Sequence, residues 1–497
     1  ENGYSVNTFV KLGSNSAECE KEAVIRPDLT DERCKKIAVG ASVAGALGKL
    51  LEYRPTWGVL TGVRPTKVAT EMLAMGMSKT RVKRQLMSDY LLYAKKANLA
   101  TEVALHEQKI IGTPSPSDCS IYVSIPFCPT RCQYCSFVCY TSEKLLSLIP
   151  EYIDRLVLDL KALFDAIDRH GLNIKTVYIG GGTPSTLTVS QLKRICDTVY
   201  ATYPVSDTPE VTIECNPDDL TPEFLKQLKT MPFNRISMGI QSFNDMQLER
   251  LGRRHNAEKA CSAVKNARTA GYENISIDLM FALPGSTKEE WMHDLETAIS
   301  LKPDHLSAYN LMYEEGTPLY NSLQRGDFKE LSEEENVEQF QMLINSMKAA
   351  GYRHYEISNF AKPGRESRHN SSYWNDTPYL GCGAAAHSYN GTSRQWNIAD
   401  IKEYIKGINS GKRNFEVEHL SEEERYNDTI LTRLRTADGI PLAWMKKKFS
   451  NKLNTYMLRA AEKEVALGNL KEKDGYLSLT EKGIFISDAV IRELIYV

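Results

Sequence analysis

Three cysteines lie close together in the stretch IPFCPTRCQYCSF, at Cys128, Cys132 and Cys135. The chain has 11 cysteines, and the other eight show no such tight mutual spacing. Thiolates are soft ligands for iron and zinc, so a C-x3-C-x2-C loop predicts metal chemistry. A [4Fe–4S] cluster needs several thiolates around one cube. Three thiolates from one loop would hold three irons and leave the fourth open to the nitrogen and oxygen donors of a small molecule.

Two other interpretations of this loop stay open at this point. Structural zinc takes four ligands, often from two paired knuckles, and a second C-x2-C pair is missing. Cys139 and the upstream His106 still supply enough ligands by count. A redox C-x-x-C pair has no need of a third thiol. The spacing therefore favours the iron–sulfur cluster over both.

The composition narrows the class of protein. At 497 residues the chain is long enough for two or three domains, and 42% hydrophobic with 25% charged residues is typical of a globular protein. A net charge of -2 gives no basic field for nucleic acid. The longest nearly apolar run, from Ile37, is too short to span a bilayer and lies too deep for a signal peptide. We therefore expect a cytoplasmic protein with no membrane span and no nucleic-acid partner.

The cysteine loop follows the first of six short β-rich runs that alternate with helical patterns. Thr188 and Thr287 stand where N-caps of two of these helices are expected. Alternating strands and helices predict parallel βα units and an α/β fold. Six strands are too few for a closed eight-stranded barrel, so we expect an open, partial barrel. The runs are CSIYVSI, IKTVYIG, EVTIEC, RISMGI, NISIDLM and DHLSAYN.

The flanking regions have a different character. Residues 1–116 hold helical stretches and predict a helical accessory domain, joined by the linker TPSPSD to a barrel over 117–345. The basic run KTRVKR is expected to be a solvated helix face. Residues 346–497 predict a substrate-related or haem-related domain. It ends in helices and a KDG hairpin, an arrangement similar to a winged helix.

The cysteine loop resembles the signature of radical S-adenosylmethionine (SAM) enzymes, because Tyr134 stands directly before the last cysteine. The resemblance implies a partial (β/α)6 TIM-type barrel, a [4Fe–4S] cluster on Cys128, Cys132 and Cys135, and SAM chelated at the open iron. It implies reductive cleavage of SAM to a 5′-deoxyadenosyl radical. The stretch YIGGGTPSTL, with Gly181, Gly182 and Thr183, is similar to the glycine motif that holds the SAM amino group.

Further motifs resemble one subfamily, oxygen-independent coproporphyrinogen III dehydrogenase and its relatives HemN, HemW and HemZ. A carboxylate at the carboxyl rim of a barrel lies where active sites form. An aspartate inside an apolar strand costs free energy unless it is bonded, and it suits a ribose hydroxyl. The N-terminal extension, with TGVRPTK, looks most like the HemZ branch. The positions similar to SAM contacts are Tyr122, Glu214, Gln241, Arg253 and Asp278.

Three positions depart from the dehydrogenase pattern. Ser124 stands where the dehydrogenases have histidine, and Phe137 stands where they have a further cysteine. His369 opens an H-N-x-x-Y-W motif that resembles the haem-chaperone and haem-degrading branches. An imidazole can bind haem iron, and His387 is a second candidate for that role.

The resemblance implies a tetrapyrrole substrate or haem, and an electron donor such as flavodoxin or ferredoxin. We expect oxidative decarboxylation of coproporphyrinogen III first, as the HemZ-like extension implies. A HemW-type haem chaperone and a haem-degrading methyltransferase are the alternatives.

Overall fold

The protein is described by a computed structural model that divides into two compact units, Glu1–Pro114 and Ser115–Val497. It describes residues 3–24, 31–51, 55–56, 58–59, 68–69, 72–73, 77–101, 117–202 and 209–497. The segment TGVRPTK, most of the TPSPSD linker and His106 lie outside these ranges.

The first unit begins with a β-hairpin that the sequence analysis did not predict. Strands β1 (Gly3–Leu12) and β2 (Asn15–Val24) pair antiparallel, and helix α1 (Asp31–Leu51) packs on them. Ser42 of α1 donates a hydrogen bond to the Cys19 carbonyl oxygen at 2.5 Å. Helix α3 (Lys79–Asp89), whose N-cap is Ser78, forms the first part of the helical stretch expected from Lys79 onward. The run KTRVKR lies at the start of α3.

The second unit is built on one 12-stranded sheet with the order β14-β13-β12-β11-β3-β4-β5-β6-β7-β8-β10-β9. All six predicted strands form, and β3 to β8 pair parallel in sequence order. The α/β fold with an open parallel barrel is thereby confirmed. Its strands are β3 (Asp118–Ile125), β4 (Asn173–Gly181), β5 (Glu210–Cys215), β6 (Arg235–Gln241), β7 (Ile275–Phe281) and β8 (His305–Asn310).

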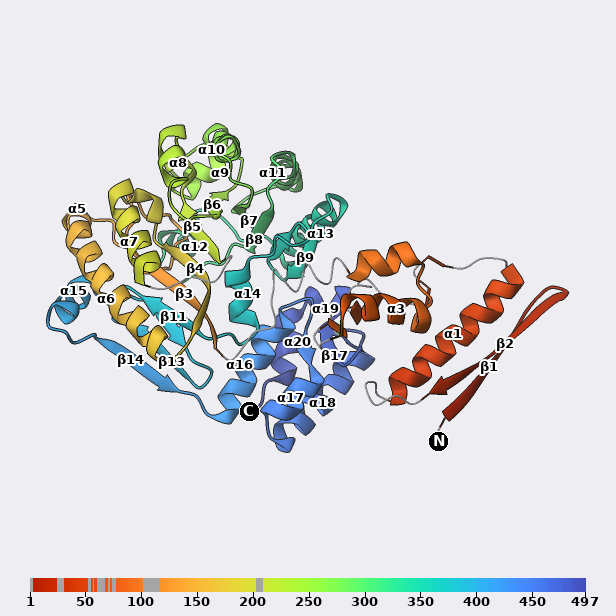
Figure 1. Cartoon of the computed structure of the whole chain (residues 1–497). Coiled ribbons are helices and arrows are strands. Elements are labelled where there is room, and N and C mark those ends of the chain that lie inside the picture. Colours follow the sequence, from red (N-terminus) through yellow and green to blue (C-terminus); the bar gives the residue numbers. More distant parts are fainter. Residues whose placement is uncertain are drawn as a thin grey trace. The chain divides into compact units, whose positions relative to one another are not determined.

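Helices cover the outer side of this sheet (Figure 1). Thr287 closes a capping box with Glu290, and the Thr188 hydroxyl accepts a hydrogen bond from the Gln191 amide, so both predicted caps are present. The helices are α5 (Glu143–Leu146), α6 (Ile149–Arg169), α7 (Val189–Thr202), α8 (Pro222–Leu228), α9 (Asp245–Arg250), α10 (Ala257–Thr269), α11 (Lys288–Ser300), α12 (Pro318–Gln324) and α13 (Glu333–Ala349), with 3-10 turns Pro184–Thr186 and Pro217–Asp219.

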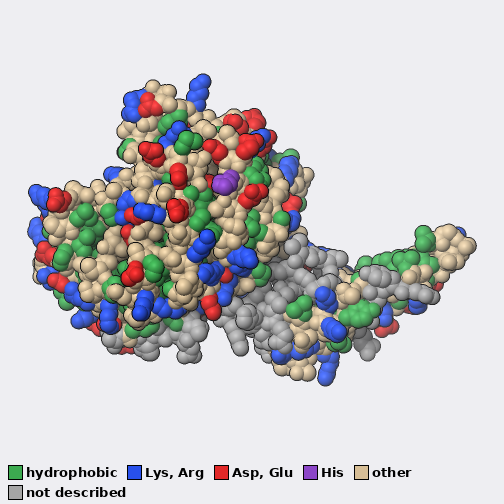
Figure 2. All heavy atoms as spheres, turned by 90° about the horizontal axis from the view of Figure 1, so that it is seen from above, with side chains coloured by type: hydrophobic (Ala, Val, Ile, Leu, Met, Phe, Trp, Pro, Cys, Tyr) green, Lys and Arg blue, Asp and Glu red, His purple; other side chains and the backbone are tan. Residues whose placement is uncertain are grey.

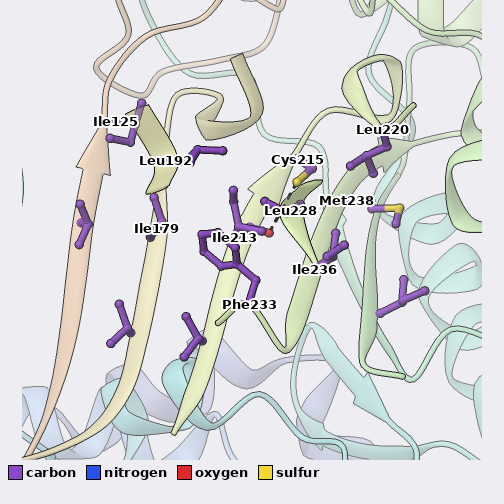
Figure 3. Packing of buried hydrophobic residues seen from close by; sticks show 14 of the residues in the cluster. Ile125, Ile179, Leu192, Ile213, Cys215, Leu220, Leu228, Phe233, Ile236 and Met238 are labelled. Atoms are coloured by element: carbon purple, nitrogen blue, oxygen red, sulfur yellow. Dashed lines mark hydrogen bonds between the residues drawn. The ribbon is translucent and has the colours of Figure 1, made fainter. Parts of the chain in front are cut away.

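The two faces of each barrel strand have different chemistry. Apolar side chains such as Ile179, Ile213 and Ile236 point outward against Leu192, Leu228 and Phe233 (Figure 3). Since neighbouring residues of a strand point to opposite faces, the residues between these apolar ones point into the barrel. That inner set is mostly polar, and it holds the candidate site residues on β3 to β7 and on the loops that follow them.

The chain after residue 345 joins the same sheet on both sides. On one edge β10 pairs antiparallel with β8, and on the other β11 pairs parallel with β3. The domain boundary predicted between 345 and 346 lies within helix α13, and strands from both sides of it join one sheet. The elements are β9 (Arg353–Glu356), β10 (Asn359–Ala361), α14 (Arg368–Trp374), β11 (Tyr379–Cys382), β12 (His387–Tyr389), β13 (Ser393–Asn397), α15 (Ile401–Asn409) and β14 (Phe415–His419).

The C-terminal module has its own apolar core and a three-stranded sheet, in which the predicted KDG hairpin is confirmed. Basic and acidic side chains are mixed over the face in Figure 2, in keeping with the small net charge. Within the described ranges no helix is both long and apolar enough to cross a membrane. The module contains α16 (Glu422–Leu434), β15 (Ile440–Pro441), α17 (Leu442–Lys448), α18 (Asn451–Ala466), β16 (Leu470–Lys473), β17 (Tyr476–Leu479), α19 (Glu481–Ile484) and α20 (Ser487–Leu494).

Candidate functional site

The three predicted cysteine ligands lie on one loop at the carboxyl end of β3. Two backbone hydrogen bonds close the base of this loop, from the Cys128 amide to the Tyr140 carbonyl (3.1 Å) and from the Tyr140 amide to the Pro126 carbonyl (2.8 Å). Phe127 is buried at the base and its ring lies 5.2 Å from that of Tyr152. The loop is therefore anchored to the barrel, while the three thiols it carries remain partly exposed.

Hydrogen-bond donors surround the sulfur atoms. The Thr183 hydroxyl donates to Cys128 Sγ at 3.3 Å, and Arg253 Nη1 donates to Cys132 Sγ at 3.2 Å. Hydrogen bonds from Cys139 and Thr183 lower the pKa of Cys128. Hydrogen bonding with Cys139, together with burial, raises the pKa of Cys135. Donors at sulfur stabilise thiolates and tune iron–sulfur clusters, so this set fits the predicted cluster.

The zinc alternative counts Cys139 and His106 as ligands, and His106 lies outside the described residues. Within the described part of the chain, no three His, Cys, Asp or Glu side chains converge as ligands of a single ion. A zinc site needs such convergence. In a [4Fe–4S] cluster each thiolate binds a different iron, so the cysteines need not point at one atom.

The glycines at the carboxyl end of β4 lie against the cysteine loop, where larger residues do not fit. A Cβ on Gly182 would lie 2.6 Å from the Phe127 carbonyl oxygen and 2.9 Å from Cys128 Sγ. Gly181 has φ of 113° and donates its amide hydrogen to Glu214 Oε2 at 3.1 Å. The glycine motif therefore brings a cluster cysteine and a candidate SAM carboxylate close to the same turn.

We expect Gly182→Ala to lose most of the iron that the wild-type chain binds, because the added methyl group pushes directly on Cys128 and on rigid backbone. Gly171→Ala is a control outside the site: a Cβ at Gly171 meets nothing within 4 Å, and the positive φ of 60° makes the substitution costly for the backbone without touching the cysteine loop. Iron and sulfide analysis after anaerobic reconstitution measures the effect. Equal iron in Gly182→Ala and wild type would contradict this account of the turn.

Two carboxyl groups lie inside the barrel below this turn. Glu214 accepts a hydrogen bond from the Tyr178 hydroxyl at 2.7 Å, and burial raises the pKa of Glu214 to about 7. Burial likewise raises the pKa of Asp278 to about 6, although hydrogen bonds with Ser307 and Ser237 oppose the shift. The negative charge of Asp278 raises the pKa of Glu214 further. Buried carboxyl groups with raised pKa values are enriched at functional sites.

Gln241 and Arg253 lie at the carboxyl edge of the barrel. Gln241 has φ of 74°, a left-handed conformation that costs free energy in a non-glycine residue, and the pairing of β6 with β7 shifts register just before it. Arg253 follows α9 and donates to the Gly239 carbonyl and, at 3.5 Å, to the Tyr134 hydroxyl. Because Arg253 also reaches Cys132, it links the barrel interior to the cysteine loop.

His369 lies in the floor of the barrel instead of at an accessible haem site. Its side chain is 1% exposed, and its ring stacks on Tyr178 with 4.8 Å between centroids. Nδ1 shares a hydrogen bond with Thr176 Oγ1 (2.7 Å), and Nε2 shares one with the Tyr373 hydroxyl (2.9 Å). Both ring nitrogens are therefore engaged, and iron ligation would require this side chain to leave the core. Tyr122 lies near it, 6.0 Å from the ring of Tyr178.

The structure thus gathers most of the candidate residues at the carboxyl edge and interior of the barrel, and His369 at its floor. Three residues with a part in this arrangement were not assigned to the site from the sequence: Tyr178, Arg235 and Cys139. Tyr178 and Arg235 alternate with buried apolar residues on β4 and β6, and that alternation was the available signal. Cys139 was considered only as a zinc ligand.

Comparison with known proteins supports the resemblance to radical SAM proteins. The sequence profile of the Radical SAM superfamily matches residues 122–298, and that of the HemN C-terminal domain matches residues 420–486. Haem chaperone HemW of Bacillus subtilis (strain 168) is 36% identical over 75% of this chain and 97% of HemW. HemZ of the same organism, named an oxygen-independent coproporphyrinogen-III oxidase-like protein, is 29% identical over 72% of this chain and 76% of HemZ.

The solved structure of coproporphyrinogen III oxidase (HemN) from Escherichia coli matches with a TM-score of 0.67 and 21% identity. The match covers 79% of this chain and 93% of HemN, and it concerns the fold alone. The sequence analysis expects the HemZ branch, but the identity to B. subtilis HemW is higher than that to B. subtilis HemZ. The chain belongs to the HemN/HemW/HemZ-like family of radical SAM proteins, and this membership implies a [4Fe–4S] cluster and SAM as its cofactors.

Proposed function

We propose that this chain is a haem-binding radical SAM protein of the HemW type. The observation that carries the proposal is the 36% identity extending over 97% of a protein named haem chaperone HemW. The dehydrogenase activity expected first becomes the second candidate, favoured by the 29% identity to HemZ. The chain lacks two features of the dehydrogenase pattern. Ser124 is a buried serine below Gly383, and Phe137 is a 73% exposed side chain in place of a thiol.

The residues at the carboxyl edge have distinct tasks in this proposal. The cluster is held by the three cysteines of the loop, with Thr183 and Arg253 donating hydrogen bonds to the sulfur atoms. SAM is held by the glycine turn and by the inward-facing side chains Tyr122, Glu214, Gln241 and Asp278. When bound, the cofactors supply one-electron reductive cleavage of SAM. An external one-electron donor, such as a flavodoxin or ferredoxin, belongs to this proposal.

The haem surface that we propose is the inner face of the sheet extension formed by β11, β12 and β13. In these strands His387 pairs with Trp396, and Tyr389 pairs with Tyr379, so all four side chains lie on one face. The ring of His387 stacks on that of Trp396 with 5.9 Å between centroids. Aromatic rings of this kind can pack on a flat macrocycle. Gly381 beside them pairs with Tyr122 of β3, so the surface continues the inner face of the barrel.

His387 is the accessible imidazole on this surface. Its side chain is exposed, in contrast to that of His369. Partial burial lowers the pKa of His387, and the nearby Arg394 lowers it further. A lowered pKa keeps the ring neutral at physiological pH, and only a neutral imidazole can offer a lone pair to iron. We therefore assign the axial ligand to His387, the second candidate of the sequence analysis.

We expect His387→Ala to weaken haem binding by about tenfold or more, because an iron ligand is removed. His419→Ala is the matched control. His419 is an exposed histidine of β14 that pairs with Ser393, so it lies on the opposite face of the same extension. Absorbance titration of the cluster-loaded protein with haem measures both affinities. Equal weakening by the two substitutions would contradict the assignment.

The proposed function itself is tested by the wild-type chain under anaerobic, reducing conditions. A chaperone binds haem and leaves coproporphyrinogen III unchanged in the presence of SAM. Loss of two carbon dioxide units per coproporphyrinogen, with matching 5′-deoxyadenosine, would establish the dehydrogenase instead. Mass spectrometry of the porphyrin products separates these outcomes.

A further inference from the structure

Strand β6 carries one extra residue near its carboxyl end, directly before the strained Gln241. Gly239 pairs with Asp278 of β7 and Gln241 pairs with Leu279, so Ile240 is the extra residue of a β-bulge. A bulge interrupts the ladder hydrogen bonds of the sheet, and its backbone groups need other partners. Bulges beside active sites often turn a side chain in a new direction. The residue that follows this bulge is Gln241, with its φ of 74°.

A buried histidine supplies a partner for the bulged residue. The side chain of His255 is 3% exposed, and its Nε2 lies 3.0 Å from the Ile240 carbonyl oxygen. Burial lowers the pKa of His255 to about 4, and the charge of Arg253 adds to this shift, so the ring is neutral near pH 7. A neutral imidazole has one N–H and a carbonyl oxygen can only accept, so Nε2 is the donor. Among the described residues Nδ1 has no hydrogen-bond partner, so the bond to Ile240 is the polar contact of this ring.

The backbone on both sides of Gln241 is held in this way. On the upstream side Arg253 donates to the Gly239 carbonyl, so the carbonyl oxygens of residues 239 and 240 are both bound by side chains that follow α9. On the downstream side Asp294 of α11 is 3% exposed and accepts two hydrogen bonds. The hydroxyl of residue 242 donates to Asp294 Oδ2, and the amide of residue 243 donates to Oδ1, each at 2.7 Å.

The side chain of Gln241 lies over Gly239. A Cβ on Gly239 would lie 2.9 Å from Gln241 Nε2 and 3.4 Å from Arg253 Nη2. Met238 belongs to the outward apolar layer (Figure 3), so Gly239 faces the interior of the barrel, as does its partner Asp278. The amide of Gln241 is therefore inside the barrel, and the absence of a side chain at Gly239 leaves the space that this amide occupies.

A left-handed conformation costs free energy in a residue other than glycine, and it persists only where surrounding contacts enforce it. Resting on the proposed SAM site, we propose that His255 and Asp294 are positioning residues, which hold the backbone on either side of Gln241 so that its amide reaches SAM across Gly239. The strained conformation is then present before SAM arrives, and binding does not have to order this side chain.

Substitution of His255 tests the upstream contact. Equilibrium dialysis of the cluster-loaded protein with radiolabelled SAM measures the affinity, and iron analysis shows whether the cluster remains. We expect His255→Leu to weaken SAM binding by about tenfold or more at an unchanged iron content. His255→Gln should restore most of the affinity, because the glutamine Nε2 can donate in place of the imidazole Nε2. His293→Leu, at an exposed histidine of α11, is the matched control and should bind SAM as the wild type does.

Substitution of Asp294 tests the downstream contact in the same assay. Asp294→Ala removes both acceptors and should also weaken SAM binding by about tenfold. Asp294→Asn keeps one acceptor for the amide of residue 243, so its loss of affinity should be smaller. Wild-type affinity in folded His255→Leu and Asp294→Ala chains would overturn the proposal.

Coupling to Gln241 separates positioning from a general loss of structure. Gly239→Ala presses on the flexible end of the Gln241 side chain and not on backbone, so this variant should fold normally and still bind SAM more weakly. In a chain that already carries Gln241→Ala, none of Gly239→Ala, His255→Leu and Asp294→Ala should weaken binding further, since the amide that they position is absent. Losses that simply add in these double variants would refute the proposal. A wild-type chain that holds its cluster but does not bind SAM would instead refute the SAM site itself.

Discussion

Cys132→Ala is expected to leave the chain unable to assemble its cluster, with iron content at background after reconstitution. The loop supplies three thiolates, and two cannot hold a [4Fe–4S] cube in place. The substitution also removes the sulfur that accepts from Arg253 Nη1 at 3.2 Å, so a buried guanidinium loses a partner. SAM cleavage should disappear together with the cluster.

Iron analysis, visible absorption and electron paramagnetic resonance of the reduced protein measure this effect. Cys261→Ala is the matched control, because Cys261 is a partly buried thiol on α10 outside the loop. Cys139→Ala supplies a further comparison, since Cys139 is hydrogen-bonded to Cys128 and Cys135. Loss of the cluster in Cys139→Ala, with retention in Cys132→Ala, would show that the ligand set was assigned to the wrong thiols.

His369→Ala is expected to lower the free energy of unfolding by about 3 kcal/mol, through a cavity in the core and two hydroxyl groups left without partners. Thr176 and Tyr373 lose the hydrogen bonds that the imidazole provides at both ends. Haem binding should be unchanged in the fraction that remains folded. Denaturant unfolding followed by circular dichroism measures the loss, and the smaller loss expected for His369→Gln separates hydrogen bonding from packing. A His369→Ala variant as stable as wild type that no longer binds haem would restore His369 as the ligand.

The same residue gives a pH dependence with a definite sign. Burial lowers the pKa of His369 to about 3 in the folded chain, against about 6.5 for an unperturbed histidine. The unfolded chain therefore binds the proton more tightly, and the contribution of His369 to stability, complete above pH 6.5, is lost as the pH falls toward 3. The difference in stability between wild type and His369→Gln should shrink over that interval.

The barrel strands could be predicted because their sequences are locally consistent. Runs such as IKTVYIG and NISIDLM are rich in β-branched residues and are bounded by turn signals, and Thr188 and Thr287 mark helix starts. The hairpin at residues 3–24 was missed, although β1 and β2 pair over their whole length. The four-residue strand β11 depends on pairing with β3, which is distant in sequence, and no local signal marks such a strand.

Some of the site residues could likewise be predicted from the sequence, and others could not. The spacing of the cysteines and the need for glycine at position 182 follow from local chemistry. The loop and Gly182 could therefore be identified from the residues around them. Burial depends on the whole fold, and the sequence of the H-N-x-x-Y-W motif does not show that α14 inserts His369 against Thr176 and Tyr178. The burial of Arg235 also depends on the whole barrel, and its neighbours in the sequence are those of an ordinary strand residue.

The pairing of β11 with β3 has a consequence for how the protein is made. Strand β3 carries the cysteine loop, but its outer edge is covered only by Tyr379–Cys382, more than 250 residues later in the chain. During synthesis, every strand from β3 to β8 emerges before the strand that covers this edge. An uncovered edge strand invites pairing with other chains. A ribosome stalled after β8, or a fragment ending near residue 345, should therefore aggregate through the strand that bears the cluster loop, and chaperone demand should fall once residue 382 has emerged.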